Sequence, residues 1–254
     1  MDRVRFSTIA HANRAFCAPV SVATFDRLTD WPGLRAGDTV FDLGCGKAAM
    51  LLRLIERFGV TATGVDTNEV FLAEARSTAQ ARGLRPDQLR LRHCDAGGPL
   101  PVASEHALVL CIGATHALGG FQAALNRIRF LVRPGGYAIL GEVFWQQPPD
   151  DEYLAVLGAS RTDLQSHPQN LADIVAAGWE IQTAAVSSLA EWDDYEDDYA
   201  QNVADWLAAH PDDPEAPAFR ERIRTWRAGY LQYGRETLGF ALYLMRRPGS
   251  PGAS

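Results

Sequence analysis

The sequence predicts an α/β fold in which helices cover both faces of a largely parallel sheet. Between residue 36 and about residue 145, short apolar runs alternate with segments of helical periodicity. The first of these runs leads into a glycine-rich turn and then directly into a helical segment. Repeated strand–helix–strand units of this length are typical of parallel sheets, because a helical crossover must return the chain to the same edge.

The composition places the chain among ordinary globular proteins. Its 254 residues fit one large domain, or one domain with an elaborated lid. With 47% hydrophobic and 22% charged residues, the chain can bury a full core, which excludes disorder over most of its length. No run approaches the roughly 18 apolar residues of a membrane span, and the first residues lack the apolar region of a signal peptide. We therefore expect a cytoplasmic protein with no membrane partner.

Charge and cysteine spacing exclude two further classes of site. The 24 Lys and Arg residues are outnumbered by 31 Asp and Glu residues, which gives a net charge of −7 without any basic tract. Nucleic-acid binding depends on clustered cations, so we expect no nucleic-acid partner. The cysteines do not show the CxxC or Cys/His spacing of zinc sites, and we expect no metal.

The core elements follow from periodicity and turn signals, taken in chain order. Asn68 is predicted to cap a helix that has Glu69 in its first turn and ends before Gly83. A Pro-Gly-Gly turn at residues 134–136 is predicted to begin a long strand. The expected strands are residues 39–45, 61–66, 89–95, 107–113 and 137–145, and the expected helices are 47–58, 69–82 and 121–132.

Beyond residue 148 the pattern changes without forming a second core. A helix is expected to end at residues 173–177, and strands are expected at 179–187 and 238–246. Between these strands, residues 190–215 carry ten acidic residues, no Lys or Arg, and several aromatic residues. One interpretation is a solvated helix whose aromatic side chains pack on the body. The other is a lid whose aromatic stripe faces a substrate.

These patterns give an expected domain organisation. The core would comprise residues 1–188 and 237–247, with an N-terminal segment that covers the site. Residues 189–236 would form the helical lid, and residues 248–254 a disordered tail.

The glycine-rich turn carries the most specific signal. Gly44, Gly46 and Ala49 match a loose dinucleotide fingerprint, in which the backbone approaches a ligand closely. Asp66 ends the second expected strand, 24 positions after Asp42, where a carboxylate can accept both hydroxyls of an adenosine ribose. The pattern therefore indicates a cofactor that contains adenosine.

Two further carboxylates narrow the choice of cofactor. Asp42 stands beside the turn, where it would repel a pyrophosphate and attract the ammonium group of an amino-acid tail. Asp95 follows the third strand and could accept a hydrogen bond from an adenine amino group. Each has a simpler interpretation: Asp42 can bond turn amides, Asp66 can cap a helix, and Asp95 can lie in a surface turn.

The motifs FDLGCGKA, GVD, CDA and LVRPGG, in this order and spacing, resemble those of class I S-adenosylmethionine-dependent methyltransferases. The segment CIGATHALGG at residues 111–120, with Gly141, Glu142 and Trp145, is similar to a bacterial subgroup that acts on small molecules. Ala48 replaces the usual third glycine, and Ala107 replaces a frequent acidic residue. The resemblance implies a Rossmann-like, seven-stranded, doubly wound sheet whose last strand is antiparallel. It also implies S-adenosylmethionine as cofactor, and methyl transfer to a small-molecule acceptor by in-line displacement.

Three groups of candidate site residues follow from the turn and this resemblance. The cofactor-binding candidates lie at the ends of four strands: Asp42, Gly44, Cys45, Gly46, Asp66, Thr67, Asp95, Ala96, Ile112 and Gly113. The catalytic candidates are His116, Glu142 and Trp145. The candidates for binding the acceptor are Phe16, Trp192, Tyr195 and Tyr199.

Two other functions stay open. An NAD-dependent oxidoreductase shares the glycine fingerprint but needs a catalytic pair such as Tyr/Lys, and Lys47, the single lysine, lies in the turn. A non-catalytic protein that binds S-adenosylmethionine would keep the cofactor residues and lack an acceptor pocket. His116 can equally be a solvated loop residue, and Trp145 a core residue. We expect a monomer or a homodimer.

Overall fold

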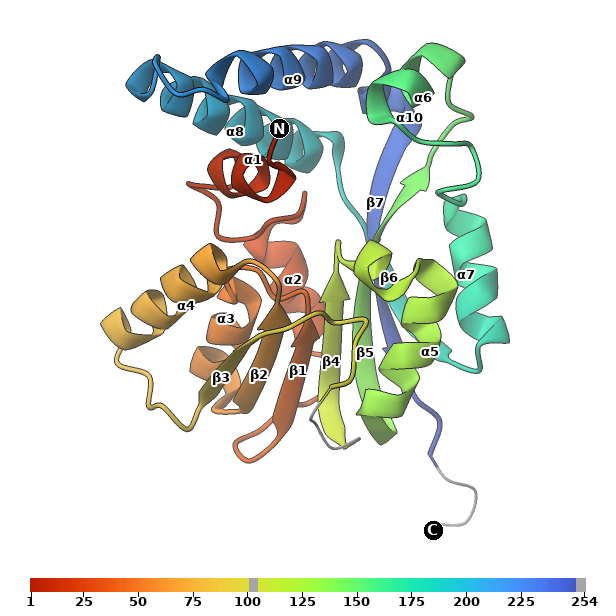
Figure 1. Cartoon of the computed structure of the whole chain (residues 1–254). Helices are drawn as coiled ribbons and strands as arrows, with labels where there is room; N and C mark the ends of the chain where they lie inside the picture. The colour runs from red at the N-terminus through yellow and green to blue at the C-terminus, as the bar shows by residue number, and fades with distance from the viewer. Residues whose placement is uncertain (101–104, 250–254) are drawn as a thin grey trace. The chain divides into compact units, whose positions relative to one another are not determined.

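The computed structural model describes residues 1–100 and 105–249, which form two compact units (Figure 1). Unit 1 comprises Met1–Val20, Val143–His167 and Ser187–Phe240. Unit 2 comprises Ser21–Glu142, Pro168–Val186 and the chain from Ala241 onward. Of the expected tail, residues 250–254 lie outside the described residues.

A seven-stranded sheet in the order β3-β2-β1-β4-β5-β7-β6 organises unit 2 (Figure 1). Strands β1 to β5 pair in parallel, and β7 is antiparallel to β6. β5 and β7 also contribute their last and first residues, respectively, to unit 1. The strands are β1 (Thr39–Leu43), β2 (Thr61–Asp66), β3 (Leu89–His93), β4 (His106–Ile112), β5 (Val132–Trp145), β6 (Glu180–Val186) and β7 (Leu238–Arg246). The expected α/β class, the seven strands and the antiparallel last strand are confirmed.

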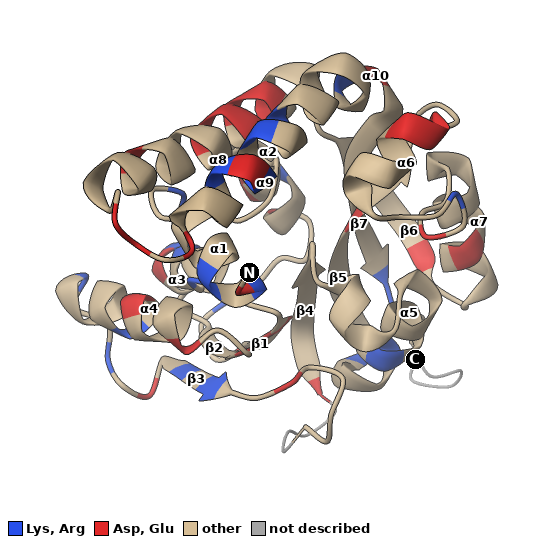
Figure 2. Ribbon diagram, turned by 45° about the horizontal axis from the view of Figure 1, so that its top comes forward, with Lys and Arg blue, Asp and Glu red and all other residues tan. Residues whose placement is uncertain are grey.

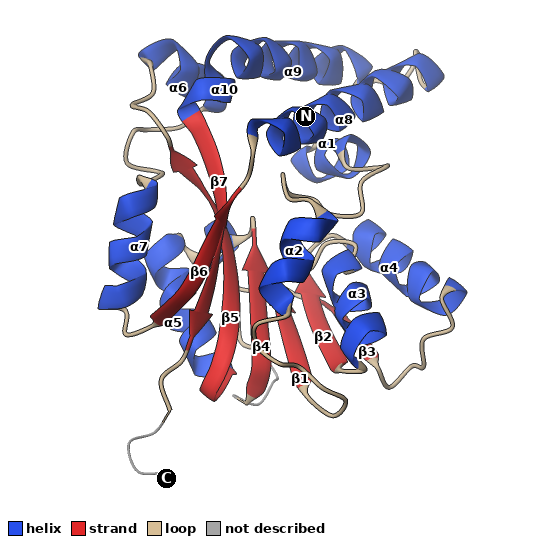
Figure 3. Cartoon of the chain, turned by 180° about the vertical axis from the view of Figure 1, so that it is seen from behind, coloured by secondary structure: helices blue, strands red, loops and turns tan. Residues whose placement is uncertain are grey.

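Helices cover both faces of this sheet, as a doubly wound fold requires. α2 and α3 lie on the face turned to the viewer in Figure 3, and α5 and α7 lie on the opposite face. The helices of unit 2 are α2 (Val22–Thr29), α3 (Ala49–Phe58), α4 (Glu69–Ala81), α5 (Phe121–Leu131) and α7 (His167–Ala176, whose first residue belongs to unit 1). The inner strands are buried: Phe41, Leu43, Leu108 and Leu110 are fully inaccessible.

Local sequence explains where these elements begin and end. The Asn68 side chain accepts hydrogen bonds from the amides of Val70 and Phe71, so the predicted cap of α4 is confirmed. β1 ends at Leu43, two residues earlier than predicted, because Gly44 turns with φ 78°. β5 begins at Val132, earlier than predicted, because Val132 pairs with His106 across an irregularity in the ladder.

Unit 1 is helical and has its own apolar core. Its helices are α1 (Arg3–Ala10), α6 (Asp151–Leu157), α8 (Leu189–Ala209), α9 (Ala216–Gly229) and α10 (Arg235–Thr237), with a π-helical turn at Tyr230–Gly234. Phe6 and Ile9 of α1 pack with Val203 and Leu207 of α8 and with Phe219 of α9. The acidic stretch is helical, and Figure 2 shows acidic residues spaced along α8.

The composition of unit 1 differs from the expected organisation. Residues 1–20 and 143–167 group with the helices that follow residue 187, whereas the sequence assigned them to the core. The physical reason is that α1 supplies three of the seven buried residues of an apolar cluster that α8 and α9 complete. Arg5 of α1 also forms ion pairs with Asp213 and Glu215 of the loop between α8 and α9, at 2.6 and 3.0 Å.

Among the helices in the described part of the chain, none combines the length and the apolar character needed to cross a bilayer.

Candidate functional site

The turn between β1 and α3 is fixed by hydrogen bonds to the neighbouring strand. The amides of Gly44 and Cys45 both donate to the carbonyl of Val65 in β2, each at 2.9 Å. Gly44 adopts φ 78°, and a Cβ at this position would overlap the Cβ of Ala114. Only glycine therefore meets both the conformational and the spatial requirement of this turn.

Asp66 joins the same turn to the start of α4. Its Oδ2 accepts a hydrogen bond from the amide of Gly46, and its Oδ1 accepts one from the amide of Asn68, both at 2.7 Å. An ionised carboxylate has about four acceptor sites, so each oxygen keeps a free lone pair. The half-buried Asp66 can thus hold the turn and still accept hydroxyl groups from a ligand.

Asp42 is buried, and no cationic side chain among the described residues forms an ion pair with it. The residue is only 4% exposed, and no group in the described part of the chain donates a hydrogen bond to its carboxylate. The turn amides bond elsewhere, so the interpretation of Asp42 as their acceptor is wrong. Burial, and then repulsion from Asp66, raises the pKa of Asp42 to about 7. A cationic group brought to this carboxylate would relieve both effects.

The remaining cofactor candidates lie at the same edge of unit 2. Asp95 is exposed after β3, and its Oδ1 accepts a hydrogen bond from the amide of Gly97 at 2.9 Å. Ala96 beside it is buried. Gly113 follows β4 with φ 70° and open space where a side chain would be. The carboxyl ends of parallel strands form the usual ligand edge of such sheets.

The hydrogen-bond acceptors at this edge fit S-adenosylmethionine. An uncompensated buried carboxylate suits the ammonium group of its amino-acid part, and Asp66 suits the ribose. A pyrophosphate would instead meet the negative charge of Asp42.

Comparison with known proteins agrees with this geometry. The sequence pattern of the methyltransferase domain family matches residues 40–136. The protein YjhP of Escherichia coli K12 is 29% identical over 248 residues, which covers 96% of this chain and 99% of YjhP. A methyltransferase of Geobacter sulfurreducens, solved with S-adenosylhomocysteine, is 28% identical with a TM-score of 0.88, covering 95% of this chain and 97% of its own. A methyltransferase of Thiobacillus denitrificans, also solved with S-adenosylhomocysteine, is 27% identical with a TM-score of 0.87. The match covers 96% of this chain and 99% of that protein's chain.

The chain is a class I S-adenosylmethionine-dependent methyltransferase.

In this methyltransferase, Ala48 occupies a position that suits glycine. Among the described non-glycine residues, Ala48 alone has a positive φ, at 53°. Its side chain is fully buried. The departure from the family pattern noted in the sequence therefore places an alanine in the left-handed region, immediately before α3.

The three catalytic candidates of the methyltransferase are divided between the units. His116 is exposed in the 3₁₀ helix Thr115–Leu118 of unit 2. Glu142 follows Gly141, which pairs with Ile112, so it lies at the ligand edge of the same unit. Trp145 belongs to unit 1, where its Nε1 donates to the carbonyl of Arg161 at 2.9 Å. This bond gives Trp145 a structural role.

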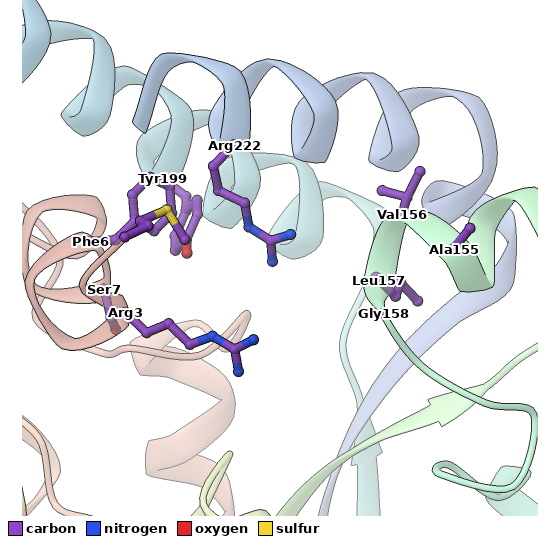
Figure 4. A pocket seen from close by; sticks show the side chains of 10 residues that line it. Arg3, Phe6, Ser7, Ala155, Val156, Leu157, Gly158, Tyr199 and Arg222 are labelled. Carbon is purple, nitrogen blue, oxygen red and sulfur yellow. The ribbon is translucent and has the colours of Figure 1, made fainter. Parts of the chain in front are cut away.

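The acceptor candidates all lie in unit 1. Phe16 is buried. Trp192, Tyr195 and Tyr199 share one face of α8, with successive ring centroids 6.3 and 6.1 Å apart. Trp192 also stacks on Tyr230. The hydroxyl of Tyr195 hydrogen-bonds His11 Nε2 at 2.9 Å. Trp192 and Tyr195 therefore hold α8 against its neighbours, whereas Tyr199 lines a pocket (Figure 4).

Two groups of residues in unit 1 were not among the candidates predicted from the sequence. Glu196 is buried on α8, accepts a hydrogen bond from Trp226 Nε1 at 2.8 Å, and has its pKa raised to about 7, mainly by burial. Because Glu196 stands within a run of acidic residues, the sequence does not distinguish it from its exposed neighbours. Arg3 and Arg222 line the same pocket as Tyr199, and no sequence motif marks them.

Proposed function

We propose that this methyltransferase transfers a methyl group from S-adenosylmethionine to a small-molecule acceptor by in-line displacement. The observation that carries the proposal is Asp42, a buried carboxylate at the glycine turn to which no group of residues 1–100 and 105–249 donates a hydrogen bond. An acidic chain without a basic tract favours a small acceptor over a nucleic acid.

The cofactor would be held by strand-end residues of unit 2. Asp42 would bind its ammonium group, Asp66 its ribose hydroxyls, and Asp95 its adenine amino group. Gly44 and Gly46 would allow the backbone to approach it closely. The candidates that complete the set are Cys45, Thr67, Ala96, Ile112 and Gly113.

Bound S-adenosylmethionine supplies a methyl group activated by the positive sulfur. The protein must then orient the acceptor and exclude water, for which effective molarities of about 10⁵ M or more are attainable. A base is needed only where the acceptor must lose a proton. His116, exposed and close in sequence to Gly113, and Glu142 are the candidates for holding that proton. Trp145 would contribute an aromatic face on the acceptor side.

On the acceptor side, the candidates are Phe16, Trp192, Tyr195 and Tyr199. Their aromatic surface suits a partly apolar molecule. Tyr199 has the strongest support, because it lines a pocket whose volume, 420 Å³, matches the size of small-molecule sites.

Two measurements test the proposal. Calorimetry should show binding of S-adenosylhomocysteine and not of NAD, with binding lost in Asp42→Asn and kept in the control Glu69→Gln on the exposed start of α4. Incubation of the protein with methyl-labelled S-adenosylmethionine and cell extract should then place the label in the low-molecular-weight fraction. Label in protein or nucleic acid would disprove a small-molecule acceptor, and tight NAD binding without a response to S-adenosylhomocysteine would disprove the cofactor assignment.

A further inference from the structure

A pocket of 420 Å³ lies within unit 1 (Figure 4). Its volume is in the range of pockets that bind small organic molecules. Three helices, α1, α6 and α9, and Tyr199 of α8 surround it. The lining residues are Met1, Arg3, Phe6, Ser7, Ala155, Val156, Leu157, Gly158, Tyr199 and Arg222.

The pocket concentrates positive charge in an otherwise acidic chain. Arg3 extends from α1 and Arg222 from α9 toward the same space (Figure 4), and none of the lining residues is acidic. Two neighbouring arginines of unit 1 are neutralised: Arg5 by Asp213 and Glu215, and Arg227 by Asp197. Within the described residues, neither Arg3 nor Arg222 forms an ion pair with a carboxylate.

The side chain of Arg222 is positioned by an aromatic neighbour. Its guanidinium carbon lies 4.9 Å from the ring centroid of Trp226, one turn further along α9. Stacking of this kind holds a guanidinium plane while its N–H groups stay available at the edge. Burial raises the pKa of Tyr199 to about 12, so its hydroxyl is protonated at neutral pH and can donate a hydrogen bond.

The opposite wall is apolar. Ala155, Val156 and Leu157 present the last turn of α6, which ends at Gly158 in the left-handed conformation. The carboxyl end of a helix carries at most about half a negative charge. Two guanidinium groups outweigh it, so the pocket is electropositive on one side and apolar on the other.

We propose that this pocket binds a small organic anion. A carboxylate or phosphate group would bridge Arg3 and Arg222, and the apolar part of the molecule would lie against α6. Both groups present oxygen pairs that match the forked N–H donors of arginine. Tyr199 lines this pocket, so the anion would be the acceptor under the proposed function, whereas the binding itself does not depend on methyl transfer.

The test uses three ligands with one apolar chain: octanoate, octyl phosphate and octanol. Calorimetry on the full chain should show binding of at least one of the two anions and much weaker binding of octanol. The stronger of the two anions identifies the preferred headgroup. Loss of one charge-assisted contact in Arg3→Gln or Arg222→Gln should weaken anion binding by about tenfold or more. Arg222→Lys should retain part of the affinity, because it keeps the charge.

Arg224→Gln is the matched control. Arg224 lies on the same helix, is exposed, and pairs with Glu221 outside the pocket, so its substitution should leave anion affinity unchanged. Unchanged binding of S-adenosylhomocysteine in all variants shows that they fold and keeps the test independent of the proposed function. Equal binding of octanol and the anions, failure of both anions to bind, or equal affinity in Arg222→Gln and Arg224→Gln would overturn the proposal.

Discussion

Asp42 and Asp66 are two carboxylates of one turn that differ in their hydrogen-bond partners. Asp66 accepts hydrogen bonds from two backbone N–H groups, which stabilise its negative charge. Asp42 is buried beside it without a donor among the described groups, so its charge is disfavoured. The ligand-free protein therefore holds Asp42 in an unfavourable state that a bound ammonium group would relieve. The difference between the two residues lies in their partners and not in their residue type.

The affinity for S-adenosylhomocysteine should fall as the pH decreases below about 7. Below this value the Asp42 carboxyl, whose pKa is raised to about 7, takes up a proton and loses its attraction for the ligand's ammonium group. Calorimetry across this pH range measures the effect, and in Asp42→Asn the remaining affinity should be low and independent of pH. An equally steep dependence in Asp42→Asn would assign the titration to another group.

The same raised pKa makes a second measurement possible without ligand. The folded state binds the proton more tightly than the unfolded chain, whose pKa is near 3.8, so this carboxyl stabilises the fold at low pH. Its contribution to the free energy of unfolding is lost as the pH rises through about 7. Asp42→Asn should therefore be more stable than the natural chain above this pH.

Asp66→Ala should weaken S-adenosylhomocysteine binding by roughly 2–4 kcal/mol, because two charge-assisted hydrogen bonds to the ribose would be lost. The variant should also lower the free energy of unfolding, since the amides of Gly46 and Asn68 lose their acceptor. Calorimetry and urea unfolding separate the two effects. Glu69→Ala, in the first turn of α4 and exposed, is the control. An unchanged dissociation constant in folded Asp66→Ala would show that the ribose is held elsewhere.

At the scale of elements, the turn between β1 and α3 depends on close approach as well as on backbone conformation. Gly44→Ala should destabilise the protein more than Gly83→Ala. Both glycines have positive φ, at 78° and 70°, so both substitutions cost about 1–2 kcal/mol of backbone strain. Only at Gly44 would the added Cβ meet another atom, the Cβ of Ala114. Equal losses in urea unfolding would show that Ala114 moves aside freely.

The elements themselves were largely predictable, because their signals are local. β2 and β7 have the predicted bounds, and α4 begins after the predicted cap. The common face of Trp192, Tyr195 and Tyr199 follows from helical spacing and is confirmed by their ring contacts. The boundary of β5 was wrong by five residues, since its start depends on pairing with His106 in another strand.

The α8 face allows the structural and functional roles of its aromatic residues to be separated. Tyr199→Phe should raise the KM for the acceptor and leave S-adenosylhomocysteine affinity and stability almost unchanged, because it removes only a hydroxyl at the pocket. Trp192→Ala should instead lower the free energy of unfolding by about 3–5 kcal/mol, since this ring is buried against Tyr230. Steady-state kinetics and urea unfolding measure the two effects. Unchanged kinetics in Tyr199→Phe would remove its hydroxyl from acceptor binding.

At the scale of the whole molecule, the chain order conceals which segments fold together. Unit 1 collects three segments that are far apart in sequence, and nothing local in residues 1–20 indicates that they complete a core with α8 and α9. The pocket was unpredictable for the same reason. Arg3 and Arg222 are separated by more than two hundred residues, and only packing brings them to one cavity. The glycine turn of unit 2 was predictable because a short local motif specifies it, and four of the ten cofactor candidates lie in that motif.

A substitution in α1 should therefore loosen helices that follow it by about two hundred residues in the chain. Phe6 is 4% exposed and packs edge-to-face on Phe219, at 5.3 Å between ring centroids. Phe6→Ala should lower the free energy of unfolding by about 3–5 kcal/mol, whereas Val4→Ala on the exposed side of α1 should change it by less than about 0.5 kcal/mol. Hydrogen exchange should speed up in α8 and α9 of Phe6→Ala. Affinity for S-adenosylhomocysteine should stay unchanged, because every cofactor candidate belongs to unit 2. Unaltered exchange in α8 and α9 would mean that these helices hold together without α1, and that residues 1–20 are not part of their core.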